Sequence, residues 1–373
     1  MASNGNAKRT IRFAVVGLGH FAQTAILPAF AGTKKCELVA LFSNDGTKLD
    51  ELKRKYHVKH ALPYEGYDEL LRSGAVDAVY IALPNDMHCD FTVRAAAAHV
   101  HVLCEKPMAI NSEECERMIT ACDAGKVKLM IAYRLHFEEA NLSTIELLNS
   151  GKLGEARYFT SAFSQQVTEG NIRTKAEHGG GPVFDIGIYC INAVRYLFRA
   201  EPTEVFAYRA SKAGDERFRE ISEQMSVVMQ FPDQRLASFI CGFGASKESF
   251  YDVVCTDGRL RLDPAYDHAR DLYQEVRFPD GKVKTTKFKK RDQIAAELVY
   301  FADCINKDKA PEPSGREGLA DLRVIEAIHQ SARTKYAVPV RPIAPKPRPS
   351  LQQEHKEPPH DKPETVHVQS PSH

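Results

Sequence analysis

The sequence contains no tryptophan, no Cys-x-x-Cys pair and no run of 18 apolar residues. The missing apolar run excludes a transmembrane helix from the prediction. Nine cysteines in 373 residues, without Cys/His clusters at zinc-binding spacing, indicate free thiols rather than a disulfide scaffold, and we expect no metal site. Neither sign of charge is in excess, because 50 basic side chains face 49 acidic ones. A net charge of +1 argues against a nucleic-acid-binding protein.

The chain has the composition of a soluble globular protein, with 43% apolar and 27% charged residues. Its 373 residues predict two domains at about 100 to 200 residues each, or even three. The polar residues 1–10 lead into the first predicted strand without an apolar signal region. We therefore expect a cytoplasmic protein with no membrane partner.

Residues 10–135 alternate between short apolar runs and helical patterns, such as residues 90–99 and 112–124. Alternating helices and apolar strands indicate a doubly wound parallel sheet covered on both faces. We predict an α/β Rossmann dinucleotide-binding domain here. Its strands are expected at residues 11–16, 37–42, 78–82, 101–104 and 128–132.

Residues 136–340 are dominated by strand patterns, with helices expected at residues 187–198, 291–306 and 316–334. Consecutive strands with few helices predict an α+β domain with an open, largely antiparallel sheet. We assign substrate binding and oligomerisation to this domain and expect the active-site cleft between it and the first. Its strands are predicted at residues 156–163, 204–209, 224–231, 235–241, 249–255, 259–262 and 272–278.

The last part of the chain, residues 342–373, is rich in proline and histidine and poor in aliphatic residues. Such a segment buries too little apolar surface to offset the entropy of ordering it. We predict a disordered tail whose histidines bind no metal.

The motif GLGHFA follows the first predicted strand and opens a helix. Its first glycine permits a tight turn, its second lets a pyrophosphate approach the main chain, and its alanine lets helix and strand pack closely. The unpaired amides at the start of the helix would face the phosphates. A strand, a helix and an alternating context accompany the motif, so we predict dinucleotide binding. The residues expected at the cofactor are Gly17, Gly19, His20, Phe21 and Ala22.

The choice between NAD and NADP depends on the end of the second strand, where NAD enzymes usually carry a carboxylate. Here Ser43 stands nearest the strand end and Lys48 follows five residues later. This pair suits a 2′-phosphate, which favours NADP over NAD. Alternatively, Ser43, Asn44 or Asp45 caps a helix and Lys48 is solvated, or Asp45 reaches a ribose hydroxyl.

Two turns, LPNDMH at residues 83–88 and CEKP at residues 104–107, follow the third and fourth strands. Open α/β sheets bind ligands at these carboxyl ends. A Glu-Lys pair in a turn is also a common surface feature, so position alone leaves the role of the lysine open. The residues of these turns expected at the cofactor site are Pro84, Asn85, His88, Glu105 and Lys106.

In the second domain, three consecutive glycines at residues 179–181 lead to Asp185 and Tyr189. Glycines at such a place allow the main chain to pass close to a ligand. Asp185 and Tyr189 are four residues apart and share one face of a helix. Either they take part in catalysis, with a lysine ammonium shifting the tyrosine toward ionisation, or they are a helix cap and a half-buried aromatic residue.

Together these motifs, with AYR at residues 132–134, resemble the Gfo/Idh/MocA family of sugar oxidoreductases over roughly residues 10–340. The wider family commonly has a histidine where this chain has Tyr189. In this respect the chain is similar to the glucose–fructose oxidoreductase branch and to related NADP-dependent xylose and dihydrodiol dehydrogenases. That branch also matches Ser43 and Lys48 as contacts of the 2′-phosphate.

The resemblance implies Lys106 as a catalytic residue that contacts the reacting hydroxyl or carbonyl. It implies Tyr189 as the proton donor or acceptor and Asp185 as a substrate-binding carboxylate. Arg134 and His88 are expected to neighbour the substrate or cofactor. Lys106 and Tyr189 would meet from opposite sides of the cleft, and their proximity would lower the pKa of the tyrosine.

We therefore expect an NADP-dependent oxidoreductase that transfers a hydride between the nicotinamide and a cyclic aldose or polyol. Gln165 and Asn192 are further polar candidates for binding the sugar. The alternatives are a reductase of an anhydro-sugar, keto-sugar or dihydrodiol, and a catalytically silent dinucleotide-binding regulator. The presence of Lys106, Asp185 and Tyr189 together argues against the regulator. A homodimer or homotetramer is expected, because an open sheet needs its outer face covered.

Overall fold

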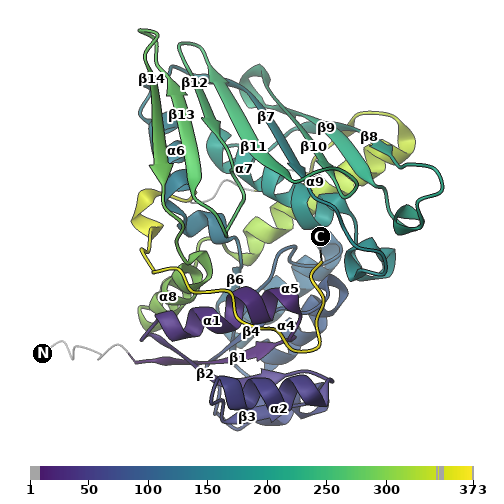
Figure 1. Cartoon of the computed structure of the whole chain (residues 1–373), viewed down its shortest axis with the longest axis vertical. Helices are drawn as coiled ribbons and strands as arrows, with labels where there is room; N and C mark the ends of the chain where they lie inside the picture. The colour runs from purple at the N-terminus through teal and green to yellow at the C-terminus, as the bar shows by residue number, and fades with distance from the viewer. Residues whose placement is uncertain (1–8, 342, 344–347, 372–373) are drawn as a thin grey trace, which may run out of the picture.

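The computed structural model describes residues 9–341, 343 and 348–371. They form two domains, each built on one sheet, with the larger sheet standing above the smaller one in Figure 1. No helix in these residues is long and apolar enough to cross a membrane. All nine cysteines are free thiols, as the sequence predicted, and the structure shows that all of them are buried.

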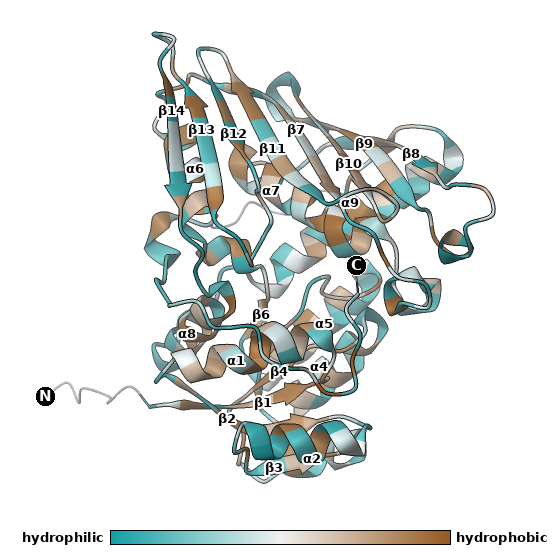
Figure 2. Ribbon diagram, viewed as in Figure 1, coloured by the Kyte–Doolittle hydropathy of each residue, from teal (hydrophilic) through white to brown (hydrophobic). Residues whose placement is uncertain are grey.

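The first domain contains a six-stranded sheet in which every neighbouring pair of strands is parallel. Its inner strands are almost completely buried, and β1 is mainly hydrophobic in Figure 2. This confirms the predicted Rossmann sheet, although strand β3 was missed because its three half-buried residues form no apolar run. In spatial order the strands are β3 (His60–Leu62), β2 (Cys36–Phe42), β1 (Ile11–Val16), β4 (Ala78–Ile81), β5 (His101–Cys104) and β6 (Leu129–Ile131).

Helices connect these strands and cover the sheet. Asp45 caps the first turn of α2 (Gly46–Lys55), where its carboxylate accepts a hydrogen bond from the Lys48 amide at 3.1 Å. Helix α8 (Gln293–Asn306), from the second half of the sequence, also packs here, with the Phe301 ring 6.4 Å from that of Phe13. The connecting elements are η1 (Ala22–Ile26), α1 (Leu27–Ala29), η2 (Phe30–Gly32), α2 (Gly46–Lys55), η3 (Tyr64–Gly66), α3 (Tyr67–Arg72), η4 (Asn85–Met87), α4 (His88–Ala97) and α5 (Ser112–Gly125).

The second domain contains a nine-stranded sheet in which β7 and β10 pair in parallel and the other described pairs are antiparallel. This confirms the predicted α+β domain. Strand β14 was missed because its sequence is polar and exposed. In spatial order the strands are β14 (Val283–Phe288), β13 (Leu272–Arg277), β12 (Arg259–Leu262), β11 (Glu248–Cys255), β7 (Ala156–Ser164), β10 (Arg235–Gly242), β9 (Gln224–Phe231), β8 (Glu204–Ala210) and β15 (Val338–Pro339).

Helices α6 (Glu139–Asn149), α7 (Ile188–Phe198) and α9 (Gly315–Thr334) cover one face of this sheet, the face toward the first domain in Figure 1. Buried side chains alternate with exposed ones along β9, which matches a sheet covered on one side only. Within the part of the chain that the structure describes, the opposite face carries exposed side chains such as Tyr158, Val228 and Leu236.

The C-terminal segment differs from the prediction of a disordered tail. Residues 348–371 run along the surface of both domains, drawn in yellow in Figure 1. Gln353 is buried and donates to the Glu312 carboxylate at 2.7 Å, and the amide of Val366 donates to the side chain of Gln23 at 2.7 Å. The segment has no hydrophobic core of its own, but hydrogen bonds with the folded domains hold it in place. Residues 342, 344–347 and 372–373 of the predicted tail lie outside the described residues.

Candidate active site

A cavity of about 720 Å³ lies between the two domains. It opens at the carboxyl ends of β1, β2, β4 and β5, and the second domain and the C-terminal segment complete its lining. The structure brings most of the predicted site residues to this one place. The predicted residues that line it are Gly17, Gly19, His20, Phe21, Ala22, Ser43, Lys48, Pro84, Asn85, Glu105, Lys106, Arg134, Asp185 and Tyr189.

The glycine motif forms the tight turn that the sequence predicted. Gly17 has φ +94°, and a Cβ atom there would lie 2.5 Å from the carbonyl oxygen of Ala82. Glycine is therefore required for the close passage of the two loops. A Cβ atom at Gly19 would meet nothing within 4 Å, so this main chain borders open space in the cavity. The helical turn starts directly after the second glycine, at His20, and its first helical hydrogen bond runs from the Gln23 amide to the Gly19 carbonyl oxygen at 3.1 Å. The amides that precede Gln23 have no acceptor within the helix and suit an anion.

At the end of β2, the structure distinguishes between the alternative roles that the sequence left open for Ser43, Asp45 and Lys48. Asp45 takes the helix cap, while Ser43 and Lys48 line the cavity. The Ser43 hydroxyl accepts a hydrogen bond from the Asp45 amide at 3.2 Å. The Lys48 ammonium lies 3.6 Å from the Asp45 carboxylate, and 17% of its side chain is exposed. A hydroxyl and an ammonium, rather than a carboxylate, thus line the cavity at this point.

Lys106, Asp185 and Tyr189 meet at the other end of the cavity. Lys106 follows β5, whereas Asp185 lies in the turn η8 (Val183–Gly187) that leads into α7. The Lys106 ammonium donates to the main-chain oxygen of Asp185 at 2.8 Å and lies 3.4 Å from its carboxylate. The same ammonium lies 4.9 Å from the centre of the Tyr189 ring. The two domains therefore place a cation, an anion and a phenol side by side.

Arg134 places a second positive charge beside this cluster. Its guanidinium lies 4.9 Å from the centre of the Tyr189 ring, and its Nε donates to the Tyr189 hydroxyl at 3.3 Å. The rest of the guanidinium binds the side chain of Gln293 and the main-chain oxygen of Tyr266. Because these contacts hold Arg134 in place, Tyr189 is oriented from both sides.

Burial and charge set the ionisation of the cluster. Burial alone would lower the pKa of Lys106, but the neighbouring Tyr189 and Asp185 outweigh it and raise that pKa. Burial alone would raise the pKa of Asp185, but Arg173 and Lys106 outweigh it and lower that pKa. The site thus keeps a lysine cation and an aspartate anion at neutral pH. Burial raises the pKa of Glu105, which accepts a hydrogen bond from the Tyr80 hydroxyl at 2.8 Å.

Arg173 is a site residue that the sequence analysis missed. It lies in the short turn η6 (Ile172–Thr174), and its Nε donates to the Asp185 carboxylate at 2.8 Å. The glycine triplet explains its position: the Gly181 amide donates to the carbonyl oxygen of Arg173 at 2.8 Å, and a Cβ atom at Gly180 would lie 2.5 Å from that oxygen. The glycines therefore close this loop as well as border the cavity. The glycine triplet was therefore the sequence signal that could have pointed to Arg173.

Two predicted site residues lie elsewhere. His88 is fully buried behind the cavity, where its ring nitrogens contact the carbonyl oxygens of Leu83 and Pro107 at 2.9 and 3.0 Å. It joins the two loops instead of facing a cofactor, and burial lowers its pKa. Asn192 is also buried and donates to Asp321 at 3.0 Å. By contrast, Gln165 lines the cavity as expected.

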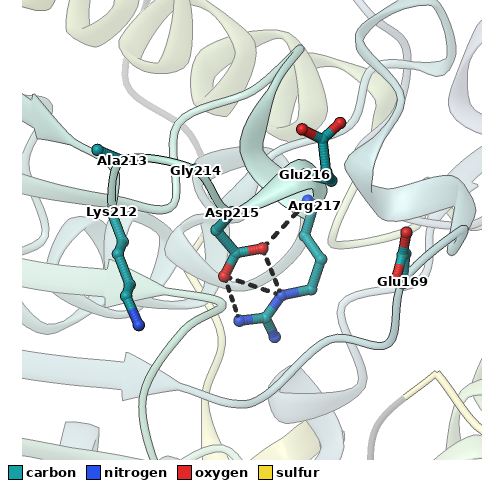
Figure 3. A pocket seen from close by; sticks show the side chains of 7 residues that line it. All are labelled: Glu169, Lys212, Ala213, Gly214, Asp215, Glu216 and Arg217. Atoms are coloured by element: carbon teal, nitrogen blue, oxygen red, sulfur yellow. Dashed lines mark hydrogen bonds and ion pairs between the residues drawn. The ribbon is translucent and has the colours of Figure 1, made fainter.

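A second hollow, of about 360 Å³, lies on the loop between β8 and β9 (Figure 3). Asp215 and Arg217 bind each other there at 2.7 Å, so these two charges neutralise one another. Its lining comes mainly from one loop and includes none of the predicted site residues. The cavity between the domains is therefore the candidate active site.

Comparison with known proteins agrees with this architecture. Residues 11–133 match the family model described as the oxidoreductase family with an NAD-binding Rossmann fold. Residues 143–261 match the GFO/IDH/MocA C-terminal domain. The D-xylose 1-dehydrogenase [NADP(+)] of Haloarcula marismortui is 32% identical over 340 residues, which cover 88% of this chain and 92% of that enzyme.

Two further proteins resemble the chain over most of its length. A dTDP-3,4-didehydro-2,6-dideoxy-alpha-D-glucose 3-reductase of Saccharopolyspora spinosa is 27% identical over 87% of this chain and 98% of its own. The aldose-aldose oxidoreductase of Caulobacter crescentus, solved with glycerol, superposes with a TM-score of 0.85 at 33% identity, covering 89% of this chain and all of that one. The chain therefore belongs to the GFO/IDH/MocA family of oxidoreductases.

Proposed function

We propose that this chain is an NADP-dependent sugar oxidoreductase acting on the CH–OH groups of a cyclic aldose or polyol. The observation that carries the proposal is the cluster of Lys106, Asp185 and Tyr189 in the same cavity as the glycine motif. The relatives named as an NADP-linked xylose dehydrogenase and an aldose-aldose oxidoreductase support the substrate class.

The cavity fits a dinucleotide. The glycine motif would hold the pyrophosphate, because Gly19 presents bare main chain to open space. Ser43 and Lys48 would hold the 2′-phosphate of NADP, with a hydrogen bond and a positive charge. Pro84, Asn85 and Glu105 would border the nicotinamide half. When bound, NADP supplies the hydride acceptor for sugar oxidation, and its reduced form supplies the donor for the reverse reaction.

The remaining chemistry is proton transfer at the sugar oxygen. Tyr189 takes this proton during oxidation and returns it during reduction. The Lys106 ammonium, 4.9 Å from the centre of the Tyr189 ring, contacts the reacting oxygen. Asp185 fixes Lys106 and binds a sugar hydroxyl, and Arg134 orients the Tyr189 hydroxyl from the other side.

A keto-sugar reductase is the second candidate, favoured by the relative from Saccharopolyspora spinosa. Its chemistry would use the same tyrosine as a proton donor. The cavity of about 720 Å³ must then also accept the nucleotide carried by such a sugar.

A substrate survey separates the candidates. The purified chain is mixed with NADP or NAD and a panel of aldoses, polyols and a dihydrodiol, and in the reverse direction with NADPH and keto-sugars. Absorbance at the NADPH band is followed. We expect oxidation of an aldose such as xylose or glucose with NADP, and weaker activity with NAD. Activity confined to keto-sugars would instead favour the second candidate.

We infer that two copies of the chain pair through the open face of the second sheet. Tyr158, Val228, Leu236 and Ile240 are 47%, 46%, 51% and 52% exposed on three adjacent strands. Leu236 stands opposite Tyr158 in the register of β10 and β7, so they share this face. Apolar side chains grouped in this way mark a protein interface. Light scattering of the chain should give twice or four times the monomer mass.

A further inference from the structure

The C-terminal segment passes over the mouth of the cofactor cavity. In Figure 1 the yellow segment crosses α1 and then rises toward the second domain. The cavity is lined in part by residues from both ends of the stretch 359–371, including Pro359 and Pro371. The cavity still has a volume of about 720 Å³ with the segment in place, so the segment borders it without filling it. This stretch lies outside both family-model matches.

Hydrogen bonds to the folded domains hold the segment at two neighbouring points. His360 contacts the Asp292 carboxylate at 2.7 Å and the carbonyl oxygen of Thr24 at 3.1 Å. Val366 exchanges two hydrogen bonds with the side chain of Gln23, at 2.7 and 2.9 Å. Thr24 and Gln23 belong to η1, the helical turn that follows the glycine motif.

Two more contacts extend the segment across the cleft. The Lys55 ammonium donates to the carbonyl oxygen of Glu364 at 2.7 Å, at the end of α2. The amide of Thr168, in the second domain, donates to the carbonyl oxygen of Pro371 at 3.3 Å. The segment thus ties the first domain to the second on the cofactor side.

Between these anchors lies Lys362, which lines the cavity near the glycine motif. His20 of that motif has a lowered pKa, first because it is buried and second because of the charge of Lys362. His20 is therefore mostly neutral at pH 7, and the motif offers a pyrophosphate only main-chain amides. Among the described residues, no carboxylate forms an ion pair with Lys362 within 4.0 Å. An available ammonium beside a phosphate-binding turn is suited to a phosphate oxygen.

We propose that residues 359–371 form part of the dinucleotide site and that Lys362 binds the pyrophosphate of NADP(H) and slows its release. The inference rests on the proposed function, because it needs a dinucleotide in the cavity. The two anchors at His360 and Val366 fix the main chain on either side of Lys362, which reduces the entropy lost when its side chain binds.

The test uses three single variants of the full chain and NADPH as the probe. Lys362→Ala removes the charge, and Lys362→Arg keeps it. Lys356→Ala is the matched control, because Lys356 is an exposed lysine of the same segment whose ammonium lies 3.3 Å from Glu354, and it does not line the cavity. NADPH affinity and dissociation rate are measured by fluorescence, at low and high salt, and amide exchange of residues 359–371 is measured with and without NADPH.

We expect Lys362→Ala to raise the NADPH dissociation constant about threefold to tenfold, mainly through faster release, as for one solvent-facing ionic contact. The loss should shrink at high salt, Lys362→Arg should restore affinity, and Lys356→Ala should bind as the wild type does. NADPH should slow amide exchange at Val366.

Three results would overturn the inference. These are unchanged affinity in Lys362→Ala, an equal loss in Lys356→Ala, and tighter binding in Lys362→Ala, which would mean that the segment competes with the cofactor. Failure of the wild type to bind NADPH at all would instead overturn the proposed function.

Discussion

Replacing Tyr189 with phenylalanine removes one hydroxyl and keeps the ring. The ring centre stays 5.6 Å from Phe163 and 5.9 Å from Tyr266, so the packing of the cavity wall is preserved. The hydroxyl accepts a 3.3 Å hydrogen bond from Arg134, and losing such a bond costs about 1 kcal/mol of unfolding free energy or less. The variant should therefore fold and bind NADPH as the wild type does.

Turnover should respond far more strongly than stability. If Tyr189 carries the proton, its loss should lower kcat by about 10²- to 10⁴-fold, which corresponds to about 3 to 5 kcal/mol in the barrier. The assay is steady-state oxidation of the best aldose, with unfolding and NADPH affinity measured on the same preparation. Tyr251→Phe is the control, because its hydroxyl donates a 3.2 Å hydrogen bond to Asn141 outside the cavity. A Tyr189→Phe variant with kcat within threefold of the control would refute the assignment.

Three further predictions concern cofactor choice, acid stability and assembly. Lys48→Ala should weaken NADP binding about tenfold and leave NAD binding unchanged, as titrations with both will show; equal losses would contradict its contact with the 2′-phosphate. The pKa of Glu201 is lowered to about 2 by Arg195 and Arg348, which outweigh burial, so its stabilising effect is complete above pH 4.5 and is lost as the pH falls toward 2. Urea unfolding of Glu201→Gln at pH 6 and pH 3 should therefore show a deficit of about 3 kcal/mol at pH 6 that shrinks at pH 3, and a constant deficit would contradict this. Ile240→Lys should halve the molar mass in light scattering; an unchanged mass would place the interface elsewhere.

The parts of the site that the sequence predicted are those encoded by short local motifs. A glycine turn after a buried strand places its main chain at the sheet edge, and Lys106 follows another such strand. Because parallel strands end at the same edge, their loops had to meet. Asp185 and Tyr189 followed from helical spacing, and their meeting with Lys106 followed from the family resemblance.

The parts that were not predicted depend on contacts between distant segments. Gln23 and Val366 are 343 residues apart in sequence, and neither neighbourhood signals the other. The composition of the tail predicts disorder for the segment considered by itself. In the structure, the two domains supply hydrogen-bond partners for its main chain, and composition does not reveal these partners. His88 was misplaced because a polar residue at a strand end looks the same whether it faces the cavity or joins two loops behind it.

The most direct test of the central claim is a single turnover. The chain is mixed with one equivalent of NADP and an excess of xylose or glucose, and absorbance at the NADPH band is recorded, with Tyr189→Phe in parallel. The account predicts the formation of NADPH, up to one equivalent, in the wild type and a rate at least about 100-fold lower in the variant. Equal rates in the two proteins, or no NADPH from any aldose or polyol by a chain that binds NADP, would contradict it.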